Sequence, residues 1–268
     1  MKILVCMKQV PASSQVEIDP ETGSLKRLGA ESRTNPYDLS ALETALRIRE
    51  TVGGTVTVLT MGPAQAEQMI RDAYMMGADD AVILSDRKFA GSDVLATSYT
   101  LAQGVRLLGG VDLILCGRQT TDGDTAQIGP AMAEHLGIPH AAWVSEITAV
   151  NDSGIEVRQC LASEEQRSRL RFPCLITVEK NSCVPRLPSY RLKKTTANRP
   201  VRMVGFGDLP DPDLSRCGLV GSPTRVEKMF APPVNAKKVR LEGTPAQEAA
   251  ALLDILREKK LIEGGARA

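Results

Sequence analysis

The loop that best defines this chain reads CGRQTTDGDTAQIGP and spans Cys116–Pro130. It follows the apolar run Val111–Cys116, which is typical of a buried strand, and it leads into a helix expected to end near Gly137. Such a strand–loop–helix unit directs unpaired backbone N–H groups and the positive end of a helix dipole at one point. The sequence therefore predicts an anion site here, typically for a nucleotide phosphate.

Pro130 limits where this helix can begin. Because proline lacks an N–H, it fits a helix best within the first turn. This places the N-cap near Ala126. The mouth of the helix would then hold Thr125, Gln127 and Ile128. A start at Asp124, with Gln127 closing a capping box, is the alternative and leaves Pro130 deeper in the helix.

The loop offers varied polar groups to a ligand. Gly117 and Gly123 permit close backbone approach, and the loop also carries hydroxyls and amides. These polar side chains belong to Gln119, Thr120, Thr121, Thr125 and Gln127. Asp122 and Asp124 would repel a diphosphate, so they are expected to bind ribose hydroxyls or backbone N–H groups. An acid-rich turn that only caps a helix remains the alternative, since this loop is not one of the strong phosphate motifs.

Strands and helices alternate over the first 137 residues. Apolar or β-branched strands are expected at 2–7, 55–60, 81–84 and 111–116, with helices at 38–50, 64–76 and 93–108 between them. Asp38 is the expected N-cap of the first helix. The alternation indicates an α/β fold with a Rossmann-like, doubly wound, mostly parallel sheet. Cys6, Met61 and Gly117 lie at strand ends that should converge on one crevice.

The pattern changes after residue 140. AAWVSEITAV and IEVRQCLA predict an antiparallel hairpin, and SRLRFPCLITVEK adds further strand; another hairpin is expected over Gln15–Arg27. Residues 181–236 are rich in proline and show little periodicity, which suggests an arm laid on another surface. An amphipathic helix follows at Thr244–Lys260. We therefore expect a nucleotide-binding domain at 1–180 and a partner-binding arm at 181–268.

The composition argues against several classes of protein. Lys and Arg total 33 and Asp and Glu 32, so no basic surface for nucleic acid is indicated. No apolar stretch is long enough for a signal-peptide core or a membrane span, and a cytoplasmic location is expected. The six cysteines never form C-x-x-C and are expected to be reduced and mostly buried, so no metal site is expected. No Walker, G-x-G-x-x-G, G-x-S-x-G or H-E-x-x-H motif occurs, and no catalytic acid, base or nucleophile is identified.

Five segments together resemble the beta subunit of electron transfer flavoproteins. They read KILVCMKQVP, NPYDLSALETAL, TMGPAQAEQMIRDAYMMGAD, CGRQTTDGDTAQIGP and SCVPRLPSY, in this order over nearly the whole chain. The resemblance implies a Rossmann-like core, an adenine nucleotide in its crevice, and a C-terminal arm that wraps an FAD-containing alpha subunit. The implied cofactor-binding residues are Cys6, Asn35, Pro36, Tyr37, Asp38, Met61, Gly117, Arg118, Gln119, Thr120, Thr121, Asp122, Gly123, Asp124, Thr125, Ala126, Gln127 and Ile128.

The segments DGDTAQIGP and CGLVGSPTRV look like the electron-bifurcating members of this family. In ordinary members the beta subunit holds AMP, and the residue near Gly123 is bulkier or more acidic. In bifurcating members a second FAD takes the place of AMP. That resemblance implies that NADH passes a hydride to the beta-subunit FAD. One electron then goes to ferredoxin or flavodoxin, and the other reaches an acyl-CoA dehydrogenase through the alpha-subunit FAD.

The resemblance also implies that the segment after Asn181 docks onto the dehydrogenase. Candidate docking residues are Leu187, Tyr190, Arg191 and Leu192, although the basic residues here could equally form a solvated surface. Two alternatives remain open. One is a non-bifurcating electron carrier with structural AMP, and the other is a nucleotide-binding regulatory module without a redox role, which leaves the long arm unexplained.

Overall fold

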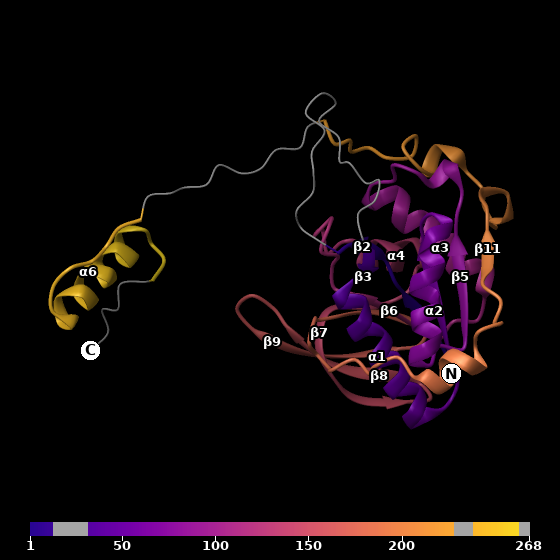
Figure 1. Cartoon of the computed structure of the whole chain (residues 1–268), viewed down its shortest axis with the longest axis horizontal. Helices are drawn as coiled ribbons and strands as arrows, with labels where there is room; N and C mark the ends of the chain where they lie inside the picture. Colours follow the sequence, from indigo (N-terminus) through magenta and orange to yellow (C-terminus); the bar gives the residue numbers. More distant parts are fainter. Residues whose placement is uncertain (13–31, 228–237, 263–268) are drawn as a thin grey trace. The chain divides into compact units, whose positions relative to one another are not determined.

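A nine-stranded sheet forms the centre of the computed structural model, which describes residues 1–12, 32–227 and 238–262 (Figure 1). Its strands lie in the order β11-β5-β4-β1-β6-β10-β7-β8-β9, and all pairs from β11 to β7 are parallel. The parallel strands are β1 (Lys2–Cys6), β4 (Thr55–Met61), β5 (Asp80–Leu84), β6 (Leu113–Gly117), β10 (Cys174–Val178) and β11 (Arg202–Val204). The predicted doubly wound α/β fold is confirmed.

Helices cover both faces of the parallel part of the sheet. The helices α1 (Pro36–Val52) and α2 (Glu67–Met76) share a core with Ile3 and Val5 of β1. On the other face, α3 (Val94–Leu108) and α4 (Ile128–Leu136) share a second core with Leu4 and Cys6. Because successive strand residues point to opposite faces, a continuous apolar run is required to fill both cores.

The strand order reverses at β1. The chain passes from β1 outward to β4 and β5, and it then returns to place β6 on the other side of β1. Cys6 therefore lies in register with Leu59 on one side and Cys116 on the other. The loops that follow β1 and β6 lead to helices on opposite faces. At such a reversal of strand order, a ligand-binding crevice is expected between these loops, at the carboxyl edge of the sheet.

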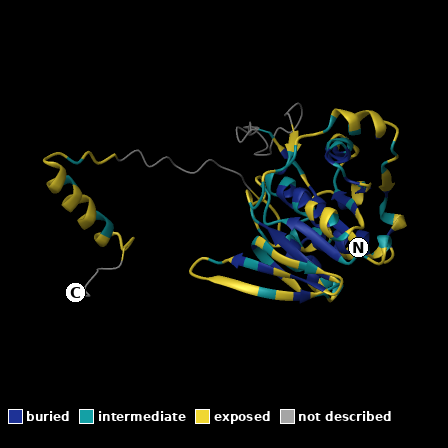
Figure 2. Ribbon diagram, turned by 90° about the horizontal axis from the view of Figure 1, so that it is seen from below, coloured by how far each residue is buried: buried dark blue, intermediate teal, exposed yellow. Residues whose placement is uncertain are grey.

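The antiparallel extension is also present. It consists of β7 (His140–Asn151), β8 (Gly154–Cys160) and β9 (Glu165–Arg171), and much of β9 is exposed (Figure 2). The stretch that was expected to add further strand divides at Phe172-Pro173. Its second half becomes β10, which is buried and runs parallel to both β6 and β7.

Short elements complete the first part of the chain. A separate two-stranded ribbon pairs β2 (Gln9–Pro11) with β3 (Ser32–Thr34), and the single-turn helices η1 (Ala64–Ala66) and η2 (Arg87–Phe89) precede α2 and α3. The hairpin expected over Gln15–Arg27 lies outside the described residues.

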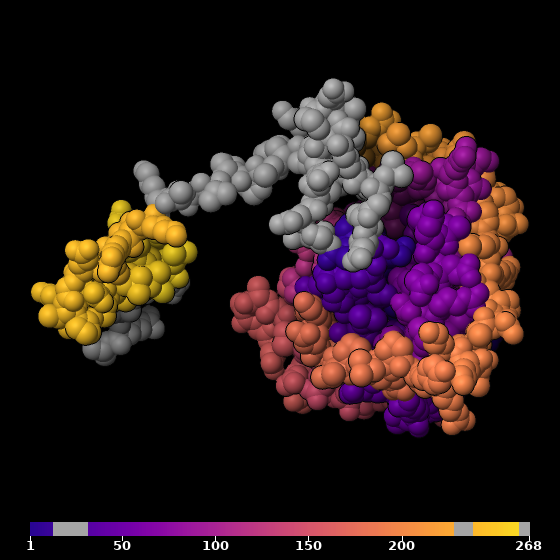
Figure 3. All heavy atoms as spheres, in the orientation of Figure 1, coloured from indigo at the N-terminus to yellow at the C-terminus, as the bar shows by residue number. Residues whose placement is uncertain are grey.

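The segment after β10 packs back onto the sheet and its helices. It includes α5 (Tyr190–Thr195), the edge strand β11, and the single-turn helices η3 (Phe206–Asp208) and η4 (Leu214–Arg216). In Figure 3 its orange atoms lie against α1 and α2, in agreement with hydrogen bonds from Asn181 to α1 and from Ser189 to α2. β11 was not anticipated, because a strand of only three residues gives no periodic signal.

The chain divides into two compact units, Met1–Lys228 and Met229–Ala268. The second contains α6 (Pro245–Glu258), which confirms the predicted helix. Its N-cap Thr244 forms a capping box with Gln247. Leu252 and Leu253 of α6 are exposed. Among the helices of the described residues, none combines the length and the apolar character needed to cross a membrane.

Candidate functional site

The first wall of the crevice is the start of α1. The helix begins at Pro36 with Asn35 as N-cap, so the expectation that Asp38 is the N-cap was wrong. Proline suits the first helical position because its φ is already helical and its missing N–H is not needed there. Asp38 instead lies in the first turn, where its side chain is buried and free to bind other loops.

Asn35 joins this wall to the loop that follows β6. Its side chain forms no cap hydrogen bond. Its Nδ2 donates to the carbonyl of Gln119 at 2.8 Å, and its Oδ1 accepts from the backbone N–H of Thr121 at 3.3 Å. Asn35 is completely buried, so both bonds replace contacts with water that it lost on folding.

Asp38 makes a second link between the same loops. Its Oδ2 accepts from the backbone N–H of Lys8 at 2.7 Å, and its Oδ1 accepts from the backbone N–H of Gly117 at 3.2 Å. Burial raises the pKa of Asp38 to about 7, although these hydrogen bonds favour the ionised form. The carboxyl group therefore titrates near neutral pH at the floor of the crevice.

Gly117 is required at this position by close packing. A Cβ there would lie 2.4 Å from Asp38 Oδ1 and 2.6 Å from Tyr37 Cβ. Any side chain would push β6 away from the start of α1. Gly117 was expected to permit close approach of a ligand. The close approach found here is to Tyr37 and Asp38 of α1, and contact with a ligand stays a prediction.

The exposed part of the loop is organised by its two aspartates. Asp122 forms an ion pair with Lys8 at 2.7 Å and accepts from the backbone N–H of Gly123 at 2.8 Å. Partial burial opposes ionisation, but hydrogen bonds from Lys8 and Thr120 outweigh it and hold the pKa of Asp122 below its usual range. Asp124 accepts a hydrogen bond from the side-chain amide of Gln119.

The helix α4 begins beyond this loop, with Gln127 as N-cap. The start is one residue later than Ala126, and Asp124 and Ala126 both adopt positive φ values, of 52° and 56°. Pro130 is thereby kept in the first turn, as its chemistry requires. No side chain of the described residues caps α4, so its first N–H groups remain available to an acceptor.

α4 approaches the sheet closely at its start. A Cβ on Gly129 would lie 2.4 Å from Thr177 Cγ2 of β10. The absence of a side chain lets the helix sit directly above the carboxyl ends of β6 and β10. This places the uncapped N-terminus of α4 at the edge of the crevice.

The remaining predicted residues occupy the floor and rim. Cys6 and Cys116 are free, buried neighbours on β1 and β6, and a hydrogen bond between the thiols together with burial raises the pKa of Cys116. Met61 ends β4 at the same sheet edge, but no hydrogen bond of the described residues connects it with the Asn35–Gly117 cluster. Pro36 and Tyr37 are half-buried beside that cluster.

The sequence analysis did not identify Lys8 as a site residue, and it did not predict the contacts of Arg118. Lys8 lies two residues after β1, and this position close to a strand end was the one sequence feature that could have indicated its role. Arg118 lies 3.9 Å from the ring centroid of Trp143 and donates to Glu179 at 2.8 Å. Trp143 has a φ of 61°, which is rare for a bulky residue. The arginine therefore joins the loop after β6 to β7 and to the end of β10.

The arrangement fits a nucleotide. Thr121, Asp122, Gly123 and Thr125 are exposed beside the uncapped start of α4, so hydroxyls and backbone N–H groups are available to phosphate and ribose oxygens. Gly123 has space, since a Cβ there would contact only Thr120 Oγ1, at 3.5 Å. The acidic Asp122 is neutralised by Lys8, which removes part of the repulsion expected for a diphosphate.

The candidate docking residues lie elsewhere, next to α1 and α2. Leu187 and Tyr190 are 87% and 70% exposed, and Arg191 is exposed as well. Leu192 is half-buried and lines a 230 Å³ hollow together with Tyr74 and Arg199. The four residues thus do not present one uniform surface.

Comparisons with known proteins agree with this architecture. Residues 22–204 match the family described as the electron transfer flavoprotein domain. Electron transfer flavoprotein subunit beta of Clostridium acetobutylicum is 41% identical over 267 residues, covering 98% of this chain and 100% of its own. The caffeyl-CoA reductase–Etf complex subunit CarD of Acetobacterium woodii is 42% identical, covering 98% and 100%. Protein FixA of Bradyrhizobium diazoefficiens is 42% identical, covering 96% and 91%. The chain belongs to the electron transfer flavoprotein family and is of its beta-subunit type.

Proposed function

We propose that this chain is the beta subunit of an electron-bifurcating flavoprotein heterodimer and that it binds FAD in the crevice after β1 and β6. The observation that carries this proposal is the open loop Thr120–Gln127, which lies between the Asn35–Asp38 wall and the uncapped start of α4. AMP in the same place, in a non-bifurcating carrier, is the alternative.

The residues of the chain have separable roles in this proposal. Asn35 and Asp38 hold the loop by its backbone, so its exposed groups are preorganised before a ligand arrives. The start of α4 would bind phosphate oxygens, and Asp122 with Lys8 would orient a ribose. Gly123 leaves room for a bulkier cofactor than AMP.

The redox chemistry belongs to the cofactor. When bound, FAD supplies hydride acceptance from NADH and the onward transfer of single electrons. The protein binds and orients the cofactor and shields it from water. For this reason the lack of an identified acid, base or nucleophile in the sequence is compatible with the proposal.

The partners are proposed from the resemblance and from the names of relatives. CarD is named for a caffeyl-CoA reductase–Etf complex, and a relative from Anaerotignum propionicum, 39% identical over 98% of this chain, is named acryloyl-CoA reductase electron transfer subunit gamma. We propose an FAD-containing alpha subunit, an acyl-CoA dehydrogenase or reductase, and ferredoxin or flavodoxin as partners. The exposed apolar residues of α6, in the second compact unit, suit a surface that binds the alpha subunit.

An anaerobic assay with the purified heterodimer tests the proposal. NADH, ferredoxin and an acyl-CoA dehydrogenase with its enoyl-CoA substrate are combined, and ferredoxin reduction is followed spectrophotometrically. We expect ferredoxin reduction only when the enoyl-CoA is present. Electron flow to the dehydrogenase without any ferredoxin reduction would favour the non-bifurcating carrier.

A further inference from the structure

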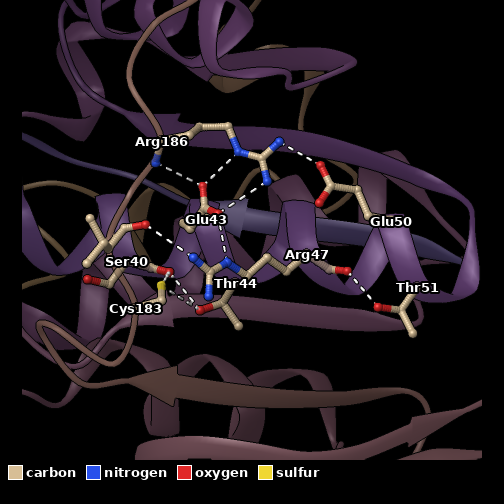
Figure 4. A network of polar contacts seen from close by, with 9 residues as sticks. Ser40, Glu43, Thr44, Arg47, Glu50, Thr51, Cys183 and Arg186 are labelled. Atoms are coloured by element: carbon tan, nitrogen blue, oxygen red, sulfur yellow. Dashed lines mark hydrogen bonds and ion pairs between the residues drawn. The ribbon is translucent and has the colours of Figure 1, made fainter.

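The segment of residues 181–186, which follows β10, forms hydrogen bonds and ion pairs with several residues of α1 (Figure 4). The backbone N–H of Asn181 donates to Ser40 Oγ at 3.3 Å, and the Cys183 thiol donates to the carbonyl of Ser40 at 3.5 Å. Thr44 Oγ1 lies 3.6 Å from Cys183 Sγ. These contacts fix the first residues of the segment on the same helix whose start builds the cofactor crevice.

Glu43 is the centre of this attachment. Its Oε2 accepts from the backbone N–H of Arg186 at 3.1 Å and from Arg186 Nε at 2.8 Å. Its Oε1 accepts from Arg47 Nε at 2.8 Å and from Arg186 Nη2 at 3.2 Å. The Glu43 side chain is only 4% exposed. Both oxygens are therefore fully used, which is what a buried carboxylate requires.

The two arginines extend the attachment in both directions. Arg186 Nη1 donates at 2.6 Å to Glu50, which lies about two turns beyond Glu43 on α1. Arg47 Nη2 donates to the carbonyl of Val184 at 3.4 Å. Burial opposes ionisation of Glu43, but hydrogen bonds from Arg186 and Arg47 outweigh it and lower its pKa. The network thus stays charged at neutral pH.

The network holds one end of a stretch with exposed apolar side chains. Val184 and Leu187 are 81% and 87% exposed, and Tyr190 opens α5 directly afterwards. At the other end, the backbone N–H of Ser189 donates to the carbonyl of Met75 in α2 at 2.8 Å. The residues between Arg186 and Ser189 are therefore held at both ends while their side chains face solvent. A stretch ordered in advance loses less conformational entropy when it binds.

We propose that Glu43 is a positioning residue that holds Arg186, and with it the exposed Leu187 and Tyr190, in the conformation that docks onto the acyl-CoA dehydrogenase. This inference rests on the proposed function, since it takes the dehydrogenase as partner. Glu43 does not contact the cofactor crevice. Its loss should change docking and leave the chemistry at the flavins intact.

Two variants of the heterodimer test the role of Glu43 from both sides. Glu43→Gln removes the charge on α1, and Arg186→Met removes the partner while keeping its aliphatic stem. Glu67→Gln is the matched control, because Glu67 also pairs with an arginine four residues on but lies on α2. We expect hydrogen–deuterium exchange over residues 184–190 to be faster in Glu43→Gln and Arg186→Met than in the wild type. In Glu67→Gln the exchange over these residues should equal that of the wild type.

Electron transfer kinetics separate docking from chemistry. The acceptors are an acyl-CoA dehydrogenase that the wild-type heterodimer reduces, and a small tetrazolium dye that needs no docking. We expect KM for the dehydrogenase to rise roughly 3- to 30-fold in Glu43→Gln and Arg186→Met. The kcat and the rate of dye reduction should stay near wild type, and Arg186→Lys should show an intermediate KM.

An unchanged KM for the dehydrogenase in both variants would overturn the proposal. Equal decreases in the rates of dehydrogenase reduction and dye reduction would overturn it as well. Thermal unfolding and flavin content show whether a variant is folded. If no dehydrogenase accepts electrons from the wild type, the proposed function fails. The hydrogen–deuterium exchange measurement does not need a dehydrogenase, so it still tests the role of Glu43 in that case. Unchanged exchange over residues 184–190 would show that Glu43 does not hold this segment.

Discussion

Two buried carboxyl groups on α1 behave in opposite ways. Asp38 lies in the first turn and receives hydrogen bonds from backbone N–H groups of Lys8 and Gly117, and burial raises its pKa to about 7. Glu43 lies five residues further on, and although burial opposes its ionisation, the guanidinium groups of Arg186 and Arg47 lower its pKa. Neutral donors do not fully offset the cost of burying a charge, whereas paired cations do.

The two carboxyl groups hold different parts of the chain on α1. Asp38, which holds the loop after β6, changes its charge near neutral pH. Glu43, which holds the segment after β10, stays ionised. We therefore expect a change of pH near neutrality to loosen the loop after β6 and to leave the segment after β10 in place.

The largest effect is expected from Asp38→Asn. Between pH 3.8, the ordinary pKa, and about 7, the unfolded wild type has lost the proton that the folded protein still holds. Wild-type stability therefore falls as pH rises through this window, and the variant lacks this dependence. As pH rises from 3.8 to about 7, the unfolding free energy of the variant should therefore gain about 4 kcal/mol relative to that of the wild type. Urea unfolding at several pH values measures it, and parallel pH profiles would contradict the raised pKa.

Gly117→Ala should break the same region by steric means. The new Cβ would overlap Asp38 Oδ1 and Tyr37 Cβ, so β6 or α1 must shift. Overpacking of this kind costs about 1–3 kcal/mol in unfolding free energy. Urea unfolding at one pH detects the loss. A variant as stable as the wild type would mean that the start of α1 yields more easily than the packing indicates.

Glu43→Gln should show the reverse pH dependence of Asp38→Asn. The stabilising effect of Glu43 is present above its ordinary pKa of 4.5 and is lost as pH falls through the lower folded value. Arg186 is partly exposed, so we expect a deficit of about 1–2 kcal/mol at pH 7, below the range for fully buried pairs. The deficit should narrow below pH 4.5. A deficit that is constant with pH would indicate lost packing instead.

Gly123→Leu should have the smallest effect on stability. The position is exposed, and a Cβ meets only Thr120 Oγ1. We expect less than about 0.5 kcal/mol change in unfolding free energy. The beta-subunit nucleotide should nevertheless be lost while the alpha-subunit flavin is retained. Chromatographic analysis of the released nucleotides checks this, and full occupancy of both sites would remove Gly123 from the proposed site.

The sequence predicted the parallel core well, because its strands are continuous apolar runs separated by helices of clear period. The limit that Pro130 sets on α4 was correct to within one residue. Asp38 was misassigned as N-cap because Asn35 followed by Pro36 was not recognised as the helix start. The edge strand β11 was missed because three residues beside a proline carry no periodicity.

The contacts that build the site were less accessible to sequence reasoning. Glu43 and Arg47 are four residues apart on one helix face, so their pairing could be expected. Arg186 is separated from Glu43 by 143 residues, and nothing local indicates that they meet. Lys8 and Asp122 are joined in the same way across 114 residues. Such long-range ion pairs depend on the assembled sheet and on the packing of its loops.

The central claim is that this crevice holds FAD, and a count of bound nucleotides tests it most directly. The chain is co-expressed with its alpha subunit, and the heterodimer is purified and denatured to release its nucleotides. We expect two FAD and no AMP for each heterodimer. One FAD together with one AMP would contradict it and identify a non-bifurcating carrier.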